Sequence, residues 1–429
     1  MKIAIAGFGL EGRASFEYWN TPGNELTIVD EKMPVEVPAD ARVLTGADVF
    51  GNLQGFDMVV RTASLAPRKI VTDGKIWSAT NEFFAKCPAP IIGVTGTKGK
   101  GTTASLISSI LRASGKTVHL LGNIGTPALG ELPKITSDHV VVFEMSSFQL
   151  WDLETSPHIA VVLMVEPDHM DIHQDMGDYV EAKKMIRRFQ TANDVCVVHP
   201  NNKVSAEVAA AATQGRVIRF SVDEPGSVHE DGGNFVLDGA VVCAVNALQL
   251  PGPHNVENAC AAMTAVFAFL GSTTGFEDGL RDFHGLPHRI EFVREVNGVT
   301  YINDSYSSAV GATKAALKSF SAPKILLVGG FDKGVEYDDL ARVVATDATV
   351  KHIFVMGQTK DKIRDAFVAV HFDRYTICDD TTLKPIVLMA QHAAKEGDVV
   401  LLSPGCASFD MFKNFTDRGE QFRAIVQAS

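Results

Sequence analysis

Short apolar runs alternate with helical patterns along almost the whole chain. The strands of a parallel sheet are covered on both faces, so they read as continuous apolar runs rather than as alternating apolar and polar residues. The pattern therefore predicts an α/β fold built on parallel sheets. Its clearest predicted strands are "KIAIAG", "LTIVD", "DMVVRT", "IIGVTG", "VVVFEM", "IAVVLMV", "VCVVHP", "KILLVGG", "HIFVMG" and "DVVLLSPG".

Prolines and glycines interrupt this alternation at two places. "KCPAPIIGV" (86–94) and "HGLPHRIEFV" (284–293) each put turn-forming residues before a new strand. We therefore expect three segments, at 1–88, 89–286 and 287–429. A polar, glycine-rich stretch near 221–240 lies inside the middle segment, and we expect it to form hairpins or loops.

Composition narrows the class of protein. The chain of 429 residues is 46% apolar and 21% charged, as in ordinary globular proteins. Its net charge of −12 argues against a general nucleic-acid binder, although small anions can still bind locally. The six cysteines are scattered with no C-x-x-C pair, so neither structural zinc nor a disulfide framework is expected. No signal peptide or membrane span is evident, and we expect a cytoplasmic protein.

A glycine pattern follows the first predicted strand. Gly7, Gly9 and Gly12 form G-x-G-x-x-G, and Asp30 ends the next strand. Such glycines let the backbone approach a phosphate, and such an acid binds a ribose hydroxyl. The segment therefore predicts a nucleotide site. A turn without a ligand, or the dinucleotide site of an oxidoreductase, would give the same pattern.

A second glycine-rich stretch, "GVTGTKGKGTT" (93–103), lies between a predicted strand and an amphipathic helix. It departs from the strict P-loop pattern because its first glycine is displaced and Gly101 follows Lys100. The order strand, loop, lysine, helix still predicts a phosphate site, since loop N–H groups and the helix start attract anions. Gly101 has no hydroxyl, so a metal ligand here would come from Thr102, Thr103 or a carboxylate elsewhere.

Candidate metal ligands follow the next two predicted strands. Glu144 ends "VVVFE", and the strand after it leads into "EPDHMDIH". Ligands collect at the carboxyl ends of parallel strands, so we expect phosphate and metal chemistry at three neighbouring strand ends. A solvated acidic loop is the alternative. The loop residues concerned are Glu166, Asp168, His169, Asp171 and His173.

Taken together, these blocks resemble the Mur ligases of peptidoglycan precursor synthesis. The similar blocks occur in the family's order over nearly the whole chain. The resemblance implies a Rossmann-like N-terminal domain that binds a UDP-linked substrate, a central P-loop ATPase domain and a Rossmann-like C-terminal domain that binds an amino acid. The blocks are "TGTKGKGTT", "GNIGTPAL", "FEMSSFQL", "EPDHMD", "YVEAKK", "PGPHNVENACAA" and "GLPHRIEFV".

The C-terminal block "LLSPGCASFDMFKNFTDRGEQF" is similar to the branch of this family that adds D-glutamate. The resemblance implies an ADP-forming amide ligase that uses ATP and Mg²⁺. It joins D-glutamate to UDP-N-acetylmuramoyl-L-alanine through an acyl phosphate, in cell-wall biogenesis that supports cell shape and division. It also implies a monomer with small-molecule partners and no nucleic acid or membrane. A Mur ligase for a different amino acid is the near alternative; an oxidoreductase or a non-catalytic nucleotide-binding regulator is more distant.

The resemblance also implies roles for individual residues. The catalytic residues are Lys100, Glu144, His169 and Lys183, the last being the lysine that the family carbamylates. The metal ligands are Thr102, Glu144, His169 and Lys183. The ATP contacts are Gly96, Thr97, Lys98, Gly99, Lys100, Gly101, Thr102, Thr103, Asn255, Asn258, Arg289 and Asp304. The substrate contacts are Leu10, Glu11, Gly12, Arg13, Asp30, Asn123, Ser146, Lys333, Ser408 and Phe415.

Three residues in two blocks depart from the family's pattern. Gly101 stands where a serine or threonine is usual. In "NDSYSSA" (303–309), Tyr306 replaces a lysine and Ser308 a threonine. That lysine helps to bind phosphate or the incoming acid, so these positions leave the identity of the amino acid open.

Overall fold

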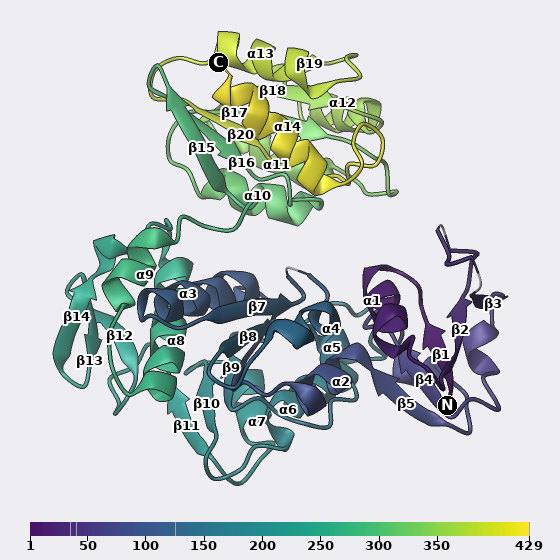
Figure 1. Ribbon diagram of the computed structural model, residues 1–429. Helices are drawn as coiled ribbons and strands as arrows, with labels where there is room; N and C mark the ends of the chain where they lie inside the picture. Colours follow the sequence, from purple (N-terminus) through teal and green to yellow (C-terminus); the bar gives the residue numbers. More distant parts are fainter. Residues whose placement is uncertain (35, 40, 125, 429) are drawn as a thin grey trace. The chain divides into compact units, whose positions relative to one another are not determined.

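The computed structural model describes residues 1–34, 36–39, 41–124 and 126–428. These residues form two compact units (Figure 1). The first unit comprises Met1–Gln249 and Pro253–Phe283, and the second comprises Leu250–Gly252 and His284–Ser429. Within the described ranges, three sheets belong to the first unit and one belongs to the second.

The N-terminal sheet is parallel throughout, as predicted. Its order is β3 (Arg42–Thr45), β2 (Glu25–Asp30), β1 (Lys2–Ala6), β4 (Met58–Arg61) and β5 (Lys75–Ser78). The other elements of this region are α1 (Leu10–Trp19), η1 (Val49–Gly51), η2 (Pro67–Lys69) and α2 (Ala79–Lys86). The Ser78 hydroxyl accepts a hydrogen bond from the amide of Asn81 and so caps α2 where β5 ends.

The central sheet places the three predicted strand ends beside one another. Its order is β11 (Arg216–Arg219), β10 (Val195–Val198), β9 (Ile159–Val162), β6 (Ile91–Thr95), β8 (Val140–Glu144) and β7 (Val118–Gly122), all parallel. Because β6 pairs with both β9 and β8, the loops after these strands share one edge, which confirms the predicted adjacency. The helices here are α3 (Lys100–Ala113), α4 (Ala128–Glu131), η3 (Leu132–Lys134), α5 (Ser147–Leu150), α6 (Met176–Arg188) and α7 (Lys203–Ala209).

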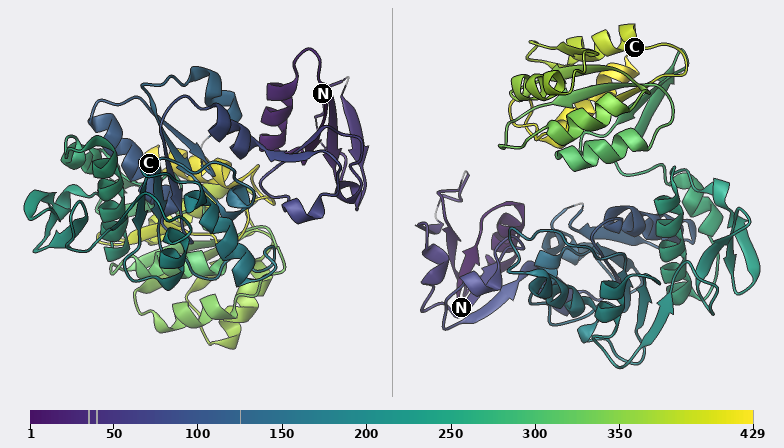
Figure 2. Two further views of the ribbon diagram at one scale, coloured as in Figure 1. Left: turned by 90° about the horizontal axis from the view of Figure 1, so that it is seen from below. Right: turned by 180° about the vertical axis from the view of Figure 1, so that it is seen from behind.

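The polar stretch near 221–240 forms antiparallel hairpins, as expected. Its strands are β12 (Val228–Asp231), β13 (Asn234–Leu237) and β14 (Ala240–Ala244), followed by η4 (Val245–Ala247), α8 (Pro253–Leu270) and α9 (Phe276–Asp282). β12 contacts α8, and both views in Figure 2 show the small sheet beside that helix. The hairpins therefore extend the central region without joining its six-stranded sheet.

The second unit has one mixed sheet. Its order is β15 (Glu291–Val296), β16 (Val299–Asn303), β20 (Val399–Leu402), β17 (Lys324–Gly329), β18 (Val350–Met356) and β19 (Tyr375–Ile377). Its helices are α10 (Val310–Lys318), α11 (Asp338–Thr346), α12 (Lys360–Ala369), α13 (Leu383–Ala393) and α14 (Phe415–Gln427). β15 is the exception to the predicted parallel pattern. Asn297 (φ 51°) and Gly298 (φ 73°) both have positive φ, which suits a two-residue hairpin turn and reverses the chain before β16.

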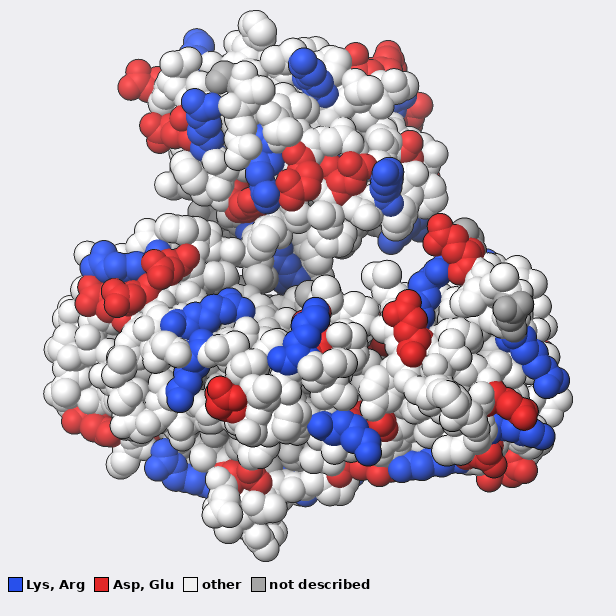
Figure 3. All heavy atoms as spheres, viewed as in Figure 1, with Lys and Arg blue, Asp and Glu red and all other residues white. Residues whose placement is uncertain are grey.

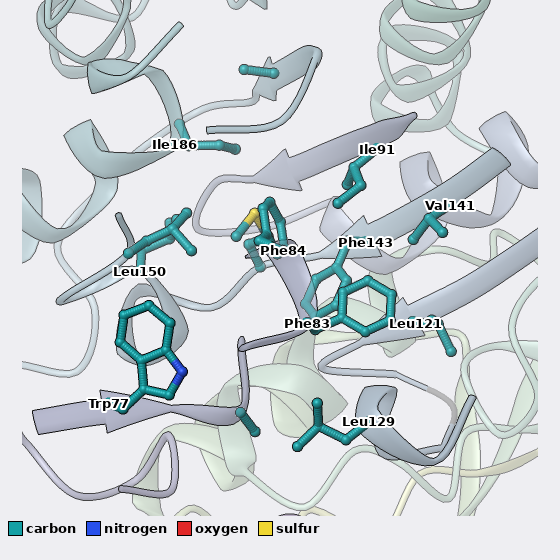
Figure 4. Packing of buried hydrophobic residues seen from close by; sticks show 14 of the residues in the cluster. Trp77, Phe83, Phe84, Ile91, Leu121, Leu129, Val141, Phe143, Leu150 and Ile186 are labelled. Carbon is teal, nitrogen blue, oxygen red and sulfur yellow. The ribbon is translucent and has the colours of Figure 1, made fainter. Parts of the chain in front are cut away.

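An apolar core joins the N-terminal and central sheets into one unit. Phe83 and Phe84 of α2 pack on Phe143 of β8, with ring centroids 5.5 and 5.3 Å apart (Figure 4). All three side chains are buried. Such aromatic pairs contribute about 0.5–1.5 kcal/mol beyond their buried area. α2 therefore anchors the first sheet to the second. Across the described ranges, no helix is long and apolar enough to cross a bilayer.

Candidate active site

The glycine-rich loop connects β6 to α3, and its conformation requires glycine at two positions. Gly96 and Gly99 have φ of 153° and 84°. A Cβ on Gly96 would lie 2.7 Å from Leu163 Cβ, and one on Gly99 would lie 2.5 Å from Asn258 Oδ1. α3 begins at Lys100, so the loop ends at a helix N-terminus, where N–H groups attract phosphate. The loop has the geometry that the sequence predicted, including Gly101 in the first turn.

Two lysines meet at one carbonyl of this loop. Lys100 Nζ donates to Gly96 O and Thr97 O, both at 3.1 Å. Lys183 Nζ, from α6, donates to the same Gly96 O at 3.0 Å and to Thr95 Oγ1 at 3.3 Å. Lys183 is 1% exposed, which excludes a solvated helix lysine. Burial, together with the charge of Lys100, lowers the pKa of Lys183 well below the ordinary lysine value. The site therefore makes the neutral amine more accessible than it is for an ordinary lysine.

Glu144 brings an unpaired carboxylate oxygen to the end of β8. Its side chain is 2% exposed, and Oε1 accepts a hydrogen bond from Asn123 Nδ2 at 3.1 Å. Oε2 is buried and has no hydrogen-bond partner among the residues that the structure describes. A buried polar atom without a partner costs about 1–3 kcal/mol, and more when charged. A cation beside Oε2 would remove that cost, so Glu144 fits the predicted metal ligand.

His169 and Thr102 are the other predicted ligands. His169 has φ 57°, its side chain is 47% exposed, and its ring centroid lies 4.9 Å from that of Phe148. Thr102 is partly buried in the first turn of α3. No group of three or more His, Cys, Asp or Glu side chains suited to a metal occurs in the described part of the chain. A cation here would therefore depend on Glu144 and His169, with oxygen donors from Thr102, the substrate, water or a carbamylated Lys183.

The helix that carries Asn255 and Asn258, two of the predicted ATP contacts, lies against the loop. Asn258, on α8, donates to Asn255 Oδ1 at 3.3 Å and accepts from Thr103 Oγ1 at 3.3 Å. Asn258 Oδ1 is also the atom that a Cβ on Gly99 would strike. The amide thus ties α8 to the loop and to the first turn of α3. Lys98, in the same loop, is exposed, and its Nζ lies 3.8 Å from Asp168 Oδ2.

A cavity of about 260 Å³ gathers several predicted substrate contacts. Leu10 and Glu11 of α1, Asn123 after β7, and residues of α2, α4, α5 and β8 line it. Glu11 Oε2 accepts from Ala63 N at 2.7 Å, and burial raises the pKa of this carboxyl although that bond opposes the rise. A Cβ on Gly12 would lie 2.0 Å from Gly7 O, so the third glycine allows α1 to pack on the loop.

Three other predicted substrate residues have structural partners of their own. Asp30 Oδ2 accepts from Phe8 N at 2.8 Å, so this acid supports the glycine turn itself. Arg13 Nη1 donates to the carbonyl of Glu36 at 2.8 Å. Ser146 caps α5 in a capping box with Gln149. None of these three lines the cavity.

The second unit carries the remaining predicted ATP contacts. The Arg289 guanidinium carbon lies 3.7 Å from the ring centroid of Tyr306, which itself lies 5.1 Å from that of Phe415. Asp304 is buried, and it accepts from Ile290 N at 3.2 Å and Ser403 Oγ at 2.7 Å. Burial raises the pKa of Asp304, although these bonds and Arg289 act in the opposite direction. Tyr306, the departure from the family's lysine, therefore holds a neighbouring arginine.

The predicted amino-acid contacts differ in exposure. Lys333 is exposed, with Nζ 5.9 Å from the ring centroid of Phe409. Ser408 is 2% exposed and opens a turn in which its carbonyl accepts from Phe412 N at 2.9 Å. Phe415 begins α14 and is 37% exposed.

Arg418 was missed by sequence reasoning. Its fully buried guanidinium donates to Ser305 and to the carbonyls of Cys406 and Ala407, and burial lowers its pKa to about 10. "NFTDRGEQ" reads as a polar helix start, and only the spacing to Phe422 on the same face hints that Arg418 points inward.

Comparison with known proteins identifies the family. The profile of the Mur ligase middle domain matches residues 94–266, and that of the Mur ligase, glutamate ligase domain matches residues 288–406. The UDP-N-acetylmuramoylalanine–D-glutamate ligase of Clostridium kluyveri is 37% identical over 446 residues, covering 99% of this chain and 96% of that protein. The enzyme of that name from Acetivibrio thermocellus is 37% identical over 453 residues, covering 100% and 96%.

Solved structures share the fold at low identity. UDP-N-acetylmuramate-alanine ligase MurC from Thermotoga maritima has a TM-score of 0.62 at 16% identity, covering 100% of this chain and 99% of that chain. MurF from Acinetobacter baumannii has a TM-score of 0.62 at 18% identity, covering 86% and 85%. MurF from Thermotoga maritima, solved in complex with ADP, has a TM-score of 0.59 at 17% identity, covering 99% and 94%.

Proposed function

Because this chain belongs to the Mur ligase family, we propose that it joins D-glutamate to UDP-N-acetylmuramoyl-L-alanine at the expense of ATP. The observation that carries the proposal is similarity over the full length to ligases of that name, together with the two lysines and the glutamate at one strand edge. An oxidoreductase is disfavoured, because Asp30 supports the glycine turn and the chain aligns with ligases from end to end.

The proposed chemistry solves a reactivity problem. A carboxylate acylates an amine poorly, so the L-alanyl carboxylate first takes the γ-phosphoryl group of ATP. The amine of D-glutamate then attacks the acyl phosphate, and phosphate leaves. Catalysis of this kind depends on positioning and on neutralising charge. The loop N–H groups and Lys100 supply both at the phosphates. Phosphate oxygens form stronger charge-assisted bonds than the carbonyls that Lys100 contacts in this structure.

The proposed metal site uses Thr102, Glu144, His169 and Lys183. The unpaired Oε2 of Glu144 supports it, as does the lowered pKa of Lys183, since a neutral amine forms a C–N bond to CO₂, releases one proton to solvent and becomes an anionic carbamate. Mg²⁺ bound there would neutralise phosphate charge. Within the chain, Asn123 orients Glu144 by donating to Oε1. The Gly96 carbonyl and Thr95 hydroxyl hold the Lys183 nitrogen towards the loop.

Binding of the two substrates completes the proposal. The cavity lined by Leu10, Glu11 and Asn123 is assigned to the UDP-linked substrate. Lys333, Ser408 and Phe415 are assigned to the amino acid, and Arg289 and Asp304 to ATP. We keep the domain bounds at 1–88, 89–286 and 287–429. On the face shown in Figure 3, acidic and basic side chains are interspersed, in keeping with small-molecule partners. A cytoplasmic monomer that serves cell-wall synthesis, and with it cell shape and division, is part of the same proposal.

A phosphate-release assay with a panel of amino acids tests the substrate. Release should require ATP, Mg²⁺, UDP-N-acetylmuramoyl-L-alanine and D-glutamate together. Release with another amino acid and none with D-glutamate would keep the ligase and reject the assigned acceptor. Tyr306 makes this panel necessary, because it stands where the family's lysine meets phosphate or the acid.

A further inference from the structure

Arg68 ties the N-terminal region to the loop that carries His169. It belongs to η2, and its side chain is 34% exposed. Nη2 donates to the carbonyl of Ile172 at 2.5 Å, and Nη1 lies 3.5 Å from Asp178 Oδ2. One guanidinium thus contacts the loop and the first turn of α6 at the same time. Its planar fork suits two acceptors that lie side by side.

The contacted segment is a closed turn that begins at His169. The carbonyl of His169 accepts from Ile172 N at 3.0 Å and from His173 N at 2.9 Å. Asp178 Oδ2, the atom that Arg68 approaches, also accepts from Gln174 N at 3.1 Å and pairs with His173 Nδ1 at 2.9 Å. Arg68 therefore contacts one of the acceptors that close the segment, Asp178 Oδ2, and also the carbonyl of Ile172 within the segment.

Packed aromatic rings connect Arg68 to the imidazole of His169. His173 Nε2 lies 2.9 Å from Ser147 Oγ, and its ring stacks on Phe148 at 5.4 Å. Phe148 in turn packs on His169 at 4.9 Å and on Trp151 at 5.1 Å. The guanidinium carbon of Arg68 lies 5.7 Å from the Trp151 ring centroid. The ring of His169 is thus connected to Arg68 through Phe148 and Trp151.

We propose that Arg68 is a positioning residue. It lies in the N-terminal region, to which the UDP-linked substrate is assigned, and it fixes the position of the 169–178 segment and of the His169 imidazole. The role of the segment in metal binding rests on the proposed function. The contacts between Arg68 and the segment do not depend on the proposed function, because all of them lie within the first unit. His169 has positive φ, which a residue other than glycine keeps only where the surrounding structure holds it, and its side chain is half-exposed.

Hydrogen–deuterium exchange tests whether Arg68 stabilises the 169–178 segment, and it does not require enzyme activity. In Arg68→Ala, amides 172–174 should exchange on the order of tenfold faster, the effect of losing one charge-assisted bond. The amide of Thr103, in α3, should be unchanged. Lys69→Ala is the matched control, since Lys69 is the exposed neighbour in the same short helix. Arg68→Lys keeps the charge without the fork and should give an intermediate rate. Unchanged exchange in both Arg68 variants overturns the proposal.

Kinetics separate positioning from substrate binding. In Arg68→Ala, kcat should fall about tenfold and the Mg²⁺ concentration for half-maximal rate should rise by about the same factor, while KM for the UDP-linked substrate changes less than about twofold. A raised KM for that substrate with unchanged kcat overturns the proposal. If the wild-type protein releases no phosphate, the proposed function fails, and the exchange data still decide whether Arg68 holds the segment.

Discussion

Lys100 and Lys183 donate to the same carbonyl oxygen, that of Gly96, at 3.1 and 3.0 Å. Two ammonium groups sharing one acceptor repel each other, and Lys183 has almost no exposure to water that would screen the repulsion. As a result, the pKa of Lys183 is lowered, and the neighbouring Lys100 stays bound to the carbonyls of the glycine-rich loop. The two lysines thus differ in environment, which suits the separate roles proposed for them in phosphate binding and in carbamate formation.

Replacing Lys100 should remove the phosphate contact. Lys100→Ala is expected to lower kcat by at least about a hundredfold, the scale of losing one preorganised charge in an active site. Single-turnover phosphate release measures it. Lys116→Ala is the control, because Lys116 is an exposed lysine that follows the end of α3 and has no assigned role. Near-normal turnover in Lys100→Ala would contradict the role given to the loop.

Replacing Lys183 should remove the amine that forms the carbamate. Lys183→Ala is expected to lose activity and to regain part of it when small carboxylates are added, because these can occupy the space of the missing group. Activity is followed by phosphate release over a concentration series of formate and acetate. A fully active variant would argue against a carbamate on this residue.

Lys183 should also make stability depend on pH. A lysine whose pKa is lowered by folding binds fewer protons in the folded state than in the unfolded state, so the free energy of unfolding rises with pH. Lys183→Met lacks this term. Its thermal stability should exceed that of the wild type most at pH below the lowered pKa. The advantage should shrink towards the ordinary lysine value of about 10.4. Melting curves in CO₂-free buffers measure this, and a pH-independent difference would contradict it.

Glu144→Gln should separate metal binding from folding. The amide keeps an acceptor for Asn123 and loses the charge at the buried, unpaired oxygen. We expect equal or higher thermal stability, since a buried charge without a partner is costly, together with a large loss of Mg²⁺-dependent turnover. Calorimetric unfolding and a Mg²⁺ titration of the rate test the two parts. A clear loss of stability would show that the carboxylate has a structural role instead.

Tyr306 should act through Arg289. The guanidinium lies over the phenol ring, a contact worth about 0.5–2 kcal/mol. Tyr306→Ala is expected to raise KM for ATP several-fold, whereas Tyr306→Phe, which keeps the ring, should not. Comparing KM for ATP and D-glutamate in the two variants tests this. An effect confined to D-glutamate would place Tyr306 at the acceptor instead.

Local pattern alone predicted the architecture of this chain and the position of its phosphate loop. Continuous apolar runs predicted the parallel strands, and the order strand, glycine loop, lysine, helix predicted the loop despite Gly101. These features depend on neighbours in sequence, so periodicity and turn chemistry reveal them. The resemblance to a family then supplied residue roles that no local pattern contains.

Only the tertiary structure decided how these residues are paired. It joined Lys183 to Gly96 across 87 positions and Arg68 to Ile172 across 104, and it left Glu144 Oε2 without a partner. It also reversed β15 and turned Arg418 inward. Burial and partner choice set the charge state and orientation of a side chain. Both depend on packing between segments far apart in the sequence, which a pattern of neighbouring residues does not contain.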